Sequence, residues 1–218
     1  MEVALISDIH GDLEKIELIG NQIKETDLVL VSGDITHFGK TEDAILIIKA
    51  LMAHNPHVFA VSGNCDYPEV ESHLLKEKIS LHAQCKTFQD FSIIGCGGSL
   101  SAPIDTPNEL SEHEIEEFLT AAYKNYCKDR PLLLVTHQPP FKTKLDRVMK
   151  MKHVGSRAVR DFIDNVQPLV GISGHIHESR DVEMMNETTL VNPGALKDGK
   201  WARMVLSGGN VEIFLENI

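Results

Sequence analysis

The sequence predicts an α/β protein in which parallel strands alternate with helices. Short apolar runs of strand length occur at 3–7, 28–31 and 58–61, and segments with helical periodicity separate them. The order strand-helix-strand-helix-strand needs crossover connections, which make such strands parallel. Polar residues follow directly after each run, as expected where a sheet of this kind binds a ligand beyond its strand ends.

Two helices are expected between these three strands. The first has apolar residues at helical spacing, namely Leu13, Ile16, Ile19 and Ile23. We expect Thr41 to cap the second, whose inner face would carry Ala44, Ile45, Ile48, Leu51 and Met52.

The rest of the chain is less regular. We expect a short helix over 68–78, a helix from the capping box at Ser111 to about Lys128, and a helix capped by Ser156 that ends before Pro168. Strands are expected at 92–95, 132–136 and 169–172, and an antiparallel C-terminal region at 181–184, 189–191, 203–206 and 211–215. The segment 138–154 is expected to be a long loop, and long loops in compact domains tend to be functional. With no internal repeat or linker, residues 1–218 are expected to form one domain.

Composition narrows the class of protein. The chain has 21 Lys and Arg against 32 Asp and Glu, a formal charge of −11, which disfavours long nucleic acids and anionic membrane surfaces as partners. Its 4 cysteines form no CxxC pair, a usage typical of reduced thiols. No signal peptide or membrane-length apolar segment is seen. We therefore expect a cytoplasmic protein that has no membrane partner.

Seven polar residues follow five predicted strands. They are Asp8, His10, Asp34, Asn64, His137, His175 and His177. Carboxylate, amide and imidazole groups without a thiolate suit borderline divalent metals. Seven such groups exceed one tetrahedral site and fit two metals with a bridging carboxylate.

Each of these pieces has an ordinary interpretation when taken alone. Asp8 and His10 could be a cap and a surface histidine, Asp34 a turn residue, Asn64 a left-handed turn residue and His137 a buried, hydrogen-bonded histidine. The metal interpretation is favoured because all the pieces lie at strand ends.

The combination resembles the calcineurin-like metallophosphoesterase superfamily. Its five motifs correspond here to Asp8-Ile9-His10, Gly33-Asp34, Gly63-Asn64-Cys65-Asp66, Thr136-His137 and Gly174-His175-Ile176-His177. The resemblance covers almost the whole chain, and it implies a four-layer αββα sandwich of two mixed sheets flanked by helices.

The resemblance also implies a ligand set. One metal would be held by Asp8, His10, Asp34 and His177, and the other by Asp34, Asn64, His137 and His175, with Asp34 bridging. Manganese is the expected ion, and iron, zinc, nickel and cobalt are alternatives. A hydroxide shared by the two ions would attack the phosphorus, with Cys65, His137 and His175 at the reacting phosphate.

Two departures from the family pattern narrow the range of possible substrate classes. Protein phosphatases and diadenosine-polyphosphate hydrolases of the superfamily carry Asp-Arg-Gly shortly after the Gly-Asp motif, whereas no arginine occurs in the stretch 35–39 here. The third motif usually contains a histidine that helps to protonate the leaving group of a monoester, whereas this chain has Cys65. Similar small phosphodiesterases also carry cysteine there, although Cys65 could simply pack as a small apolar residue. We therefore expect a small phosphodiester substrate, with nucleotides and cyclic nucleotides as candidates.

Further residues are candidates for substrate contact. His37 follows the predicted bridging Asp34, while His153 and Ser156 lie at the start of a helix whose N-terminus could hold an anion. The long loop carries five basic residues, which either steer a phosphorylated substrate or are a solvated surface: Lys142, Lys144, Arg147, Lys150 and Lys152.

Two other functions remain open. A DNA exonuclease of the superfamily would need a capping domain, for which 218 residues leave little room. A non-catalytic scaffold, as in the retromer subunit with this fold, would have lost metal-site histidines that are intact here. The sequence leaves the oligomeric state open.

Overall fold

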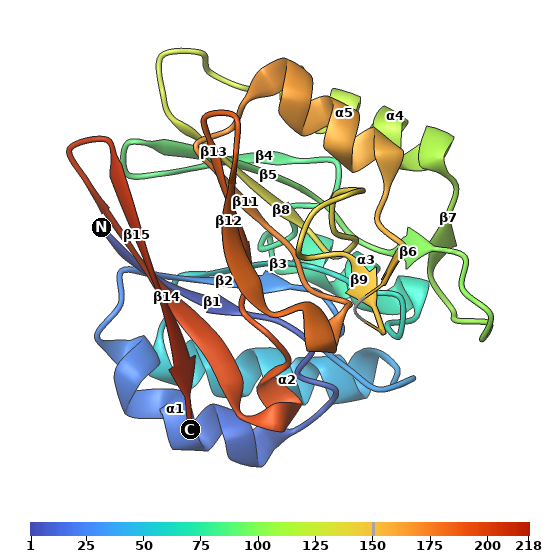
Figure 1. Ribbon diagram of the computed structural model, residues 1–218. Coiled ribbons are helices and arrows are strands. Elements are labelled where there is room, and N and C mark those ends of the chain that lie inside the picture. Colours follow the sequence, from blue (N-terminus) through green and yellow to red (C-terminus); the bar gives the residue numbers. More distant parts are fainter. Residues whose placement is uncertain (150) are drawn as a thin grey trace.

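The computed structural model describes residues 1–149 and 151–218, and two β-sheets form its centre (Figure 1). The first sheet has five strands, in the spatial order β15 (Asn210–Asn217), β14 (Lys200–Ser207), β1 (Glu2–Ile6), β2 (Leu28–Ser32) and β3 (Val58–Val61). Strands β1, β2 and β3 are parallel, and β14 and β15 add an antiparallel edge.

The second sheet has six strands. Their order is β12 (Asp181–Met185), β13 (Thr188–Asn192), β11 (Val170–Ile172), β8 (Leu132–Thr136), β5 (Phe91–Cys96) and β4 (Cys85–Phe88). The four central strands are parallel, and the two edge strands β12 and β4 are antiparallel to their neighbours.

Helices cover the outer faces of the two sheets, as Figure 1 shows. Helices α1 (Leu13–Lys24), α2 (Thr41–His54) and α3 (Pro68–Lys76) cover the first sheet, whereas α4 (Glu112–Tyr123) and α5 (Arg157–Val166) cover the second. The predicted four-layer αββα sandwich is confirmed.

Strand β1 shows why four layers form. Its side chains alternate between two cores, because successive residues of a strand point to opposite faces. Ala4 and Ile6 pack against the helices, while Val3 and Leu5 pack against the second sheet. A strand buried on both faces reads as a continuous apolar run.

Side-chain hydrogen bonds cap the N-termini of three helices. Asp12 accepts a hydrogen bond from the backbone of Lys15 at the start of α1. Ser111 and Glu114 form the predicted capping box of α4. Ser156 caps α5 through the backbone N–H of Val159.

Some predicted boundaries were wrong. Helix α4 ends at Tyr123 instead of about Lys128, because the N–H of Tyr126 bonds to the Tyr123 carbonyl in a tighter turn. Thr41 is the first residue of α2 rather than its cap, which is Lys40.

Short elements lie in segments for which we predicted no helix or strand. Strands β6 (Ser99–Leu100) and β7 (Glu109–Leu110) pair with each other. The expected long loop contains an antiparallel pair, β9 (Arg147–Val148) and β10 (Lys152–His153). Short 3-10 helices span His177–Ser179 (η1) and Leu196–Asp198 (η2). No helix in the described part of the chain has both the length and the apolar character of a membrane span.

Candidate metal centre

The seven predicted ligand residues lie at the carboxyl ends of strands from both sheets. Asp8, Asp34 and Asn64 follow β1, β2 and β3 of the first sheet, while His137 directly follows β8 of the second. Backbone hydrogen bonds tie these loops together: the N–H of Asp8 donates to the Gly33 carbonyl at 3.0 Å. The same edge of the sandwich therefore holds residues that are far apart in the sequence.

Four of the seven residues have a left-handed backbone. The φ angles are 53° at Asp8, 50° at His10, 51° at Asp34 and 68° at His175. This conformation is unfavourable for residues other than glycine and clusters at functional sites. Asn64 is not among the residues with positive φ, so its interpretation as a left-handed turn residue does not apply.

Asp8, His10 and His177 form the first group of facing donor atoms. Nε2 of His177 lies 3.0 Å from Oδ1 of Asp8 and 3.4 Å from Nε2 of His10. Nε2 of His10 lies 4.0 Å from the same Asp8 oxygen. Three potential ligand atoms thus converge from two separate loops.

Asp34, Asn64 and His137 form the second group. Nε2 of His137 lies 2.9 Å from Oδ1 of Asn64 and 3.4 Å from Oδ1 of Asp34. The other Asp34 oxygen, Oδ2, lies 3.6 Å from Nε2 of His10 in the first group. The Asp34 carboxylate therefore directs one oxygen to each group.

His175 lies beside the second group. Its ring centroid is 5.0 Å from that of His137, and its backbone N–H donates to Oδ2 of Asp8 at 3.1 Å. The structure thus brings all seven predicted ligand residues to one edge.

The orientation of His137 tests whether a cation fits this edge. Its Nδ1 lies 2.7 Å from the Ser32 carbonyl, which assigns the proton to Nδ1 and leaves Nε2 with a lone pair. That lone pair faces the acceptor oxygens of Asn64 and Asp34, so either a proton or a cation must lie between them. A divalent ion fits this donor set of imidazole and oxygen groups.

The charges at this edge also favour a cation. Burial lowers the pKa of His10 and of His175 to about 3, so both rings are neutral at neutral pH. Burial raises the pKa of Asp34 to about 6. Burial alone would lower the pKa of His137, but the nearby carboxylates of Asp34 and Asp8 outweigh it and the pKa is raised. A bound cation would replace the proton that Asp34 and His137 hold between them.

Two glycines allow the loops to approach this closely. A Cβ atom at Gly63 would collide with the carboxylate of Asp34. Gly33 has a φ of +97°, and a Cβ atom there would collide with the ring of His137.

Comparisons with known proteins agree with this geometry. A family model described as calcineurin-like phosphoesterase matches residues 1–179. The chain belongs to this family. It is 36% identical over 198 residues to an uncharacterized protein of Methanocaldococcus jannaschii, MJ1162, and the match covers 88% of each chain.

Solved structures share the fold. The protein TT1561 of Thermus thermophilus has a TM-score of 0.76 and 19% identity, with 98% of this chain and 97% of that chain covered. A novel archaeal phosphodiesterase has a TM-score of 0.55 and 16% identity, with 99% of this chain and 100% of that chain covered. As a calcineurin-like phosphoesterase, the chain is a hydrolase of phosphoester bonds.

Cys65, an expected catalytic residue, and His37, an expected substrate contact, lie beside His10 at the metal centre of this calcineurin-like phosphoesterase. A potential ligand atom of Cys65 and one of His37 lie within 4.8 Å of each other and of one in His10. Nδ1 of His37 is 3.2 Å from Nδ1 of His10, on the side of that ring away from the other ligands. Burial raises the pKa of the Cys65 thiol, which stays protonated at neutral pH.

The other two expected substrate contacts, Ser156 and His153, form hydrogen bonds to residues outside the metal centre. Ser156 is buried, and its hydroxyl and the N–H groups of Arg157 and Ala158 bind the Glu112 carboxylate. The N-terminus of α5 therefore already has its anion and has no free donor for a substrate. Nδ1 of His153 lies 2.6 Å from Oδ1 of the buried Asp146, and no hydrogen bond joins His153 to the seven ligand residues in the described ranges.

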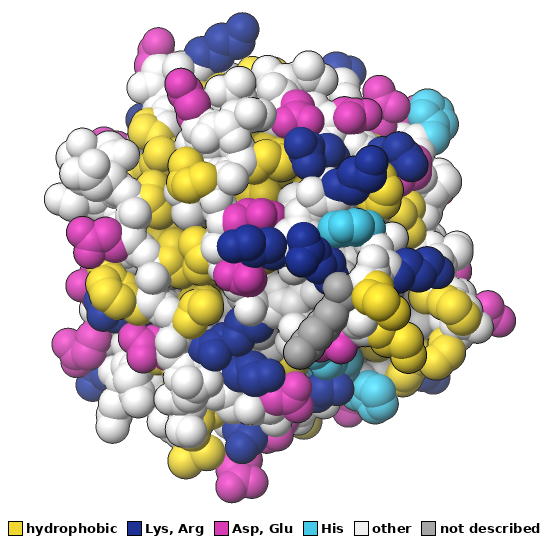
Figure 2. Space-filling model, viewed as in Figure 1, with side chains coloured by type: hydrophobic (Ala, Val, Ile, Leu, Met, Phe, Trp, Pro, Cys, Tyr) yellow, Lys and Arg dark blue, Asp and Glu magenta, His cyan; other side chains and the backbone are white. Residues whose placement is uncertain are grey.

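The basic loop is not a uniformly positive surface. Figure 2 shows Lys and Arg side chains interspersed with Asp and Glu across the middle of one face. Lys144 and Arg147 line a hollow of about 310 Å³ together with Glu178 and Asp181. Lys150, the fourth of the five basic residues, lies outside the described residues.

Two further residues hold a ligand side chain and a ligand loop of the centre in place. The Ser32 carbonyl orients His137, as described above. Nδ2 of Asn192 donates to the Ile176 carbonyl at 3.0 Å and so fixes the loop between His175 and His177. Asp66 holds the third-motif loop in place, because its carboxylate accepts hydrogen bonds from the N–H groups of Gly63, Ile35 and Thr36.

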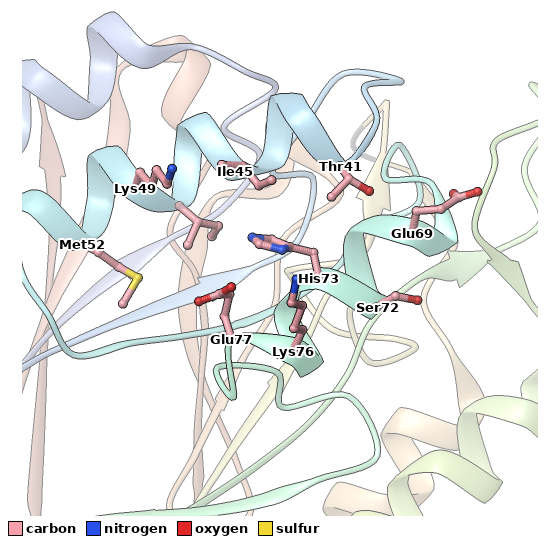
Figure 3. A pocket seen from close by; sticks show the side chains of 10 residues that line it. Thr41, Ile45, Lys49, Met52, Glu69, Ser72, His73, Lys76 and Glu77 are labelled. Carbon is pink, nitrogen blue, oxygen red and sulfur yellow. The ribbon is translucent and has the colours of Figure 1, made fainter.

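A separate groove of about 460 Å³ lies between α2 and α3. Figure 3 shows its side chains facing each other, with Ile45, Lys49 and Met52 on α2, His73 and Lys76 on α3 and Glu77 directly after α3. None of its lining residues belongs to the seven at the metal centre.

Proposed function

We propose that this chain is a metal-dependent phosphodiesterase that hydrolyses small phosphodiesters at a pair of divalent ions. The observation that carries the proposal is the Asp34 carboxylate, whose Oδ2 faces His10 and whose Oδ1 faces His137. Asp8, His10, Asp34 and His177 would hold one ion, and Asp34, Asn64, His137 and His175 the other.

The proposed metal is manganese, with iron, zinc, nickel and cobalt as alternatives that suit the same donors. When bound, such a pair of ions lowers the pKa of water and neutralises charge on phosphate oxygens. No side chain then has to act as the nucleophile.

The residues of the chain would position these groups and the substrate. The buried Asp34 carboxylate is fixed by the backbone N–H of Cys65 at 2.8 Å, so the bridging group is preorganised. The Ser32 carbonyl keeps the Nε2 lone pair of His137 aimed at the centre. We place His137 and His175 beside the reacting phosphate, where their rings lie edge to face.

Preference for a diester follows from Cys65. A monoester dianion carries one more negative charge than a diester, so expulsion of a poorly stabilised alkoxide from it depends strongly on a nearby proton donor. The buried thiol of Cys65 has a raised pKa and is a weak donor. An aryl or similarly stabilised leaving group depends least on such an acid, which supports a phosphodiester as the substrate.

The test compares two substrates with the same leaving group. The Mn²⁺-loaded protein should hydrolyse bis(4-nitrophenyl) phosphate with a higher kcat/KM than 4-nitrophenyl phosphate. The variant Asp34→Asn, purified identically, controls for a contaminating phosphatase. A higher kcat/KM for the monoester would overturn the diester assignment, and degradation of linear DNA would favour the exonuclease alternative. A protein that binds no metal and hydrolyses neither ester would favour the scaffold alternative.

We also propose a cytoplasmic location without a membrane partner. The observation that supports it is that all 4 cysteines are free in the structure. A fractionation of cells that places the protein with membranes would contradict it.

A further inference from the structure

A hollow of about 320 Å³ adjoins the metal centre on the side of His10. It lies between the beginning of α1, the first turns of α2 and the loop after β2, and its lining includes His10, Leu13, His37, Phe38, Asp43 and Leu46. His10 belongs both to this hollow and to the metal centre, with Nε2 facing the metal ligands and Nδ1 facing His37, so a substituent of a phosphate at the metals would reach the hollow by passing this ring.

Three apolar side chains on the lining of this hollow are exposed. Leu13 is 40%, Phe38 43% and Leu46 56% exposed. Single exposed apolar residues are ordinary on a protein surface. Here three of them, from three separate segments, line one hollow beside a predicted metal ligand together with the polar side chains of His10, His37 and Asp43, so a ligand there would meet both apolar and polar groups.

The backbone of Phe38 is strained. Its φ of 55° is a rare conformation for a bulky residue. The N–H of Phe38 donates to the Cys65 carbonyl at 3.0 Å. Two residues earlier, the N–H and the hydroxyl of Thr36 donate to the carboxylate of the buried Asp66. Such strain persists only where surrounding contacts determine it, and it occurs preferentially at binding sites.

A row of aromatic rings joins the hollow to the metal centre. The ring centroids of Phe38 and His37 are 4.9 Å apart with an interplanar angle of 66°, and those of His37 and His10 are 5.2 Å apart at 72°. Both pairs have edge-to-face geometry. Phe38 thus packs edge to face against His37 and, at 43% exposure, leaves part of its side chain open to a ligand.

We infer that Phe38 binds a planar, apolar substituent of the phosphodiester, such as an aryl group or a nucleobase, and that Leu13 and Leu46 contact the same substituent. This inference rests on the proposed function and names the substrate class of its site. The Asp43 carboxylate at the same hollow would repel an anionic substituent such as a second phosphate.

The test measures binding of two phosphodiester analogues that differ only in one substituent. These are the monomethyl esters of phenylphosphonic acid and methylphosphonic acid, titrated calorimetrically into the Mn²⁺-loaded protein. Base–aromatic stacking contributions predict that the wild type binds the phenyl analogue about 5- to 100-fold more tightly than the methyl analogue.

Variants at Phe38 identify the cause of that ratio. Phe38→Ala should remove most of the preference and leave binding of the methyl analogue nearly unchanged, whereas Phe38→Trp should keep the preference. Leu18→Ala, which truncates a leucine that is 49% exposed on α1 and does not line the hollow, is the matched control and should keep the wild-type ratio.

Two results would overturn the inference. A wild-type ratio near one excludes an apolar subsite, and an unchanged ratio in Phe38→Ala, with native circular dichroism, excludes Phe38 as its cause. In both cases hydrolysis of bis(4-nitrophenyl) phosphate by the wild type would leave the proposed function standing. If the wild type binds neither analogue and hydrolyses no diester, the proposed function fails and the inference fails with it.

Discussion

Replacing Asp34 with asparagine should make the metal-free protein more stable and should weaken its stabilisation by metal. Asp34 is buried, and burial raises its pKa from 3.8 to about 6. A carboxyl group with a raised pKa favours the protonated folded state, so its ionisation destabilises the protein as the pH rises from about 4 to 6, and the loss persists above that range. A shift of about two units corresponds to at most about 3 kcal/mol at pH 7.5. Asparagine has no charge and avoids this destabilisation. It also removes the carboxylate that raises the pKa of His137, so the net gain should be smaller than about 3 kcal/mol.

Metal binding should narrow the difference in stability between the two proteins. At a free ion concentration of about 100 times Kd, the wild type should gain about 2.7 kcal/mol. For a chain of this size, that gain raises Tm by about 5–10 °C. In Asp34→Asn the amide would supply one neutral oxygen in place of the two charged oxygens that face both donor groups, so the gain in the variant should be less than half.

Thermal unfolding at pH 7.5, followed by circular dichroism, measures both effects. Each protein is unfolded once with chelator and once with Mn²⁺. Asp66→Asn is the comparison variant. Burial raises the pKa of Asp66 as well, but both of its oxygens accept backbone N–H groups, from Ile35, Thr36 and Gly63, and the NH2 group of an amide cannot accept them. Asp66→Asn should be less stable than the wild type both with and without metal.

The comparison can refute the reasoning in two ways. If Asp34→Asn is less stable than the wild type in chelator at pH 7.5, the buried charge is not the dominant effect. If its Tm rises with Mn²⁺ as much as that of the wild type, Asp34 does not bridge two ions.

Three further predictions concern the ligands and the leaving group. His175→Ala should remove most diesterase activity with little change in circular dichroism, and activity within a few-fold of wild type would show that the second site is misplaced. Cys65→His should raise kcat/KM for an aryl monoester more than for the matched diester, since a protonated imidazole also offsets the additional negative charge of the monoester; an unchanged ratio would remove Cys65 as the cause of the preference. The affinity for Mn²⁺, measured by titration between pH 5 and 8, should fall as the pH drops through about 6, where Asp34 gains a proton. A pH-independent affinity would contradict the assignment of Asp34 as a ligand.

The positions of the strands and the seven polar residues could be predicted because both depend on local patterns. An apolar run such as that of β2 must be buried on both faces, and polar residues directly after it must lie at its carboxyl end. Parallel connection of β1, β2 and β3 then brings Asp8, Asp34 and Asn64 together whatever the details of the loops.

Features that depend on contacts between distant segments could not be predicted. Ser156 caps α5 as expected, but the Glu112 carboxylate, 44 residues earlier in the chain, occupies the donors that a substrate would need. Nothing in the sequence around Ser156 indicates that partner. Likewise, the left-handed backbone of Phe38 follows from its bond to the Cys65 carbonyl, which needs β2 and β3 to be adjacent.

Metal-dependent hydrolysis of a phosphodiester tests the central claim most directly. The chain is stripped with chelator, its metal content is checked by elemental analysis, and hydrolysis of bis(4-nitrophenyl) phosphate is followed while Mn²⁺ is added. We expect negligible activity without metal and full activity after about two equivalents, because the Asp34 carboxylate faces two donor groups. Full activity in protein shown to be free of metal would contradict the account.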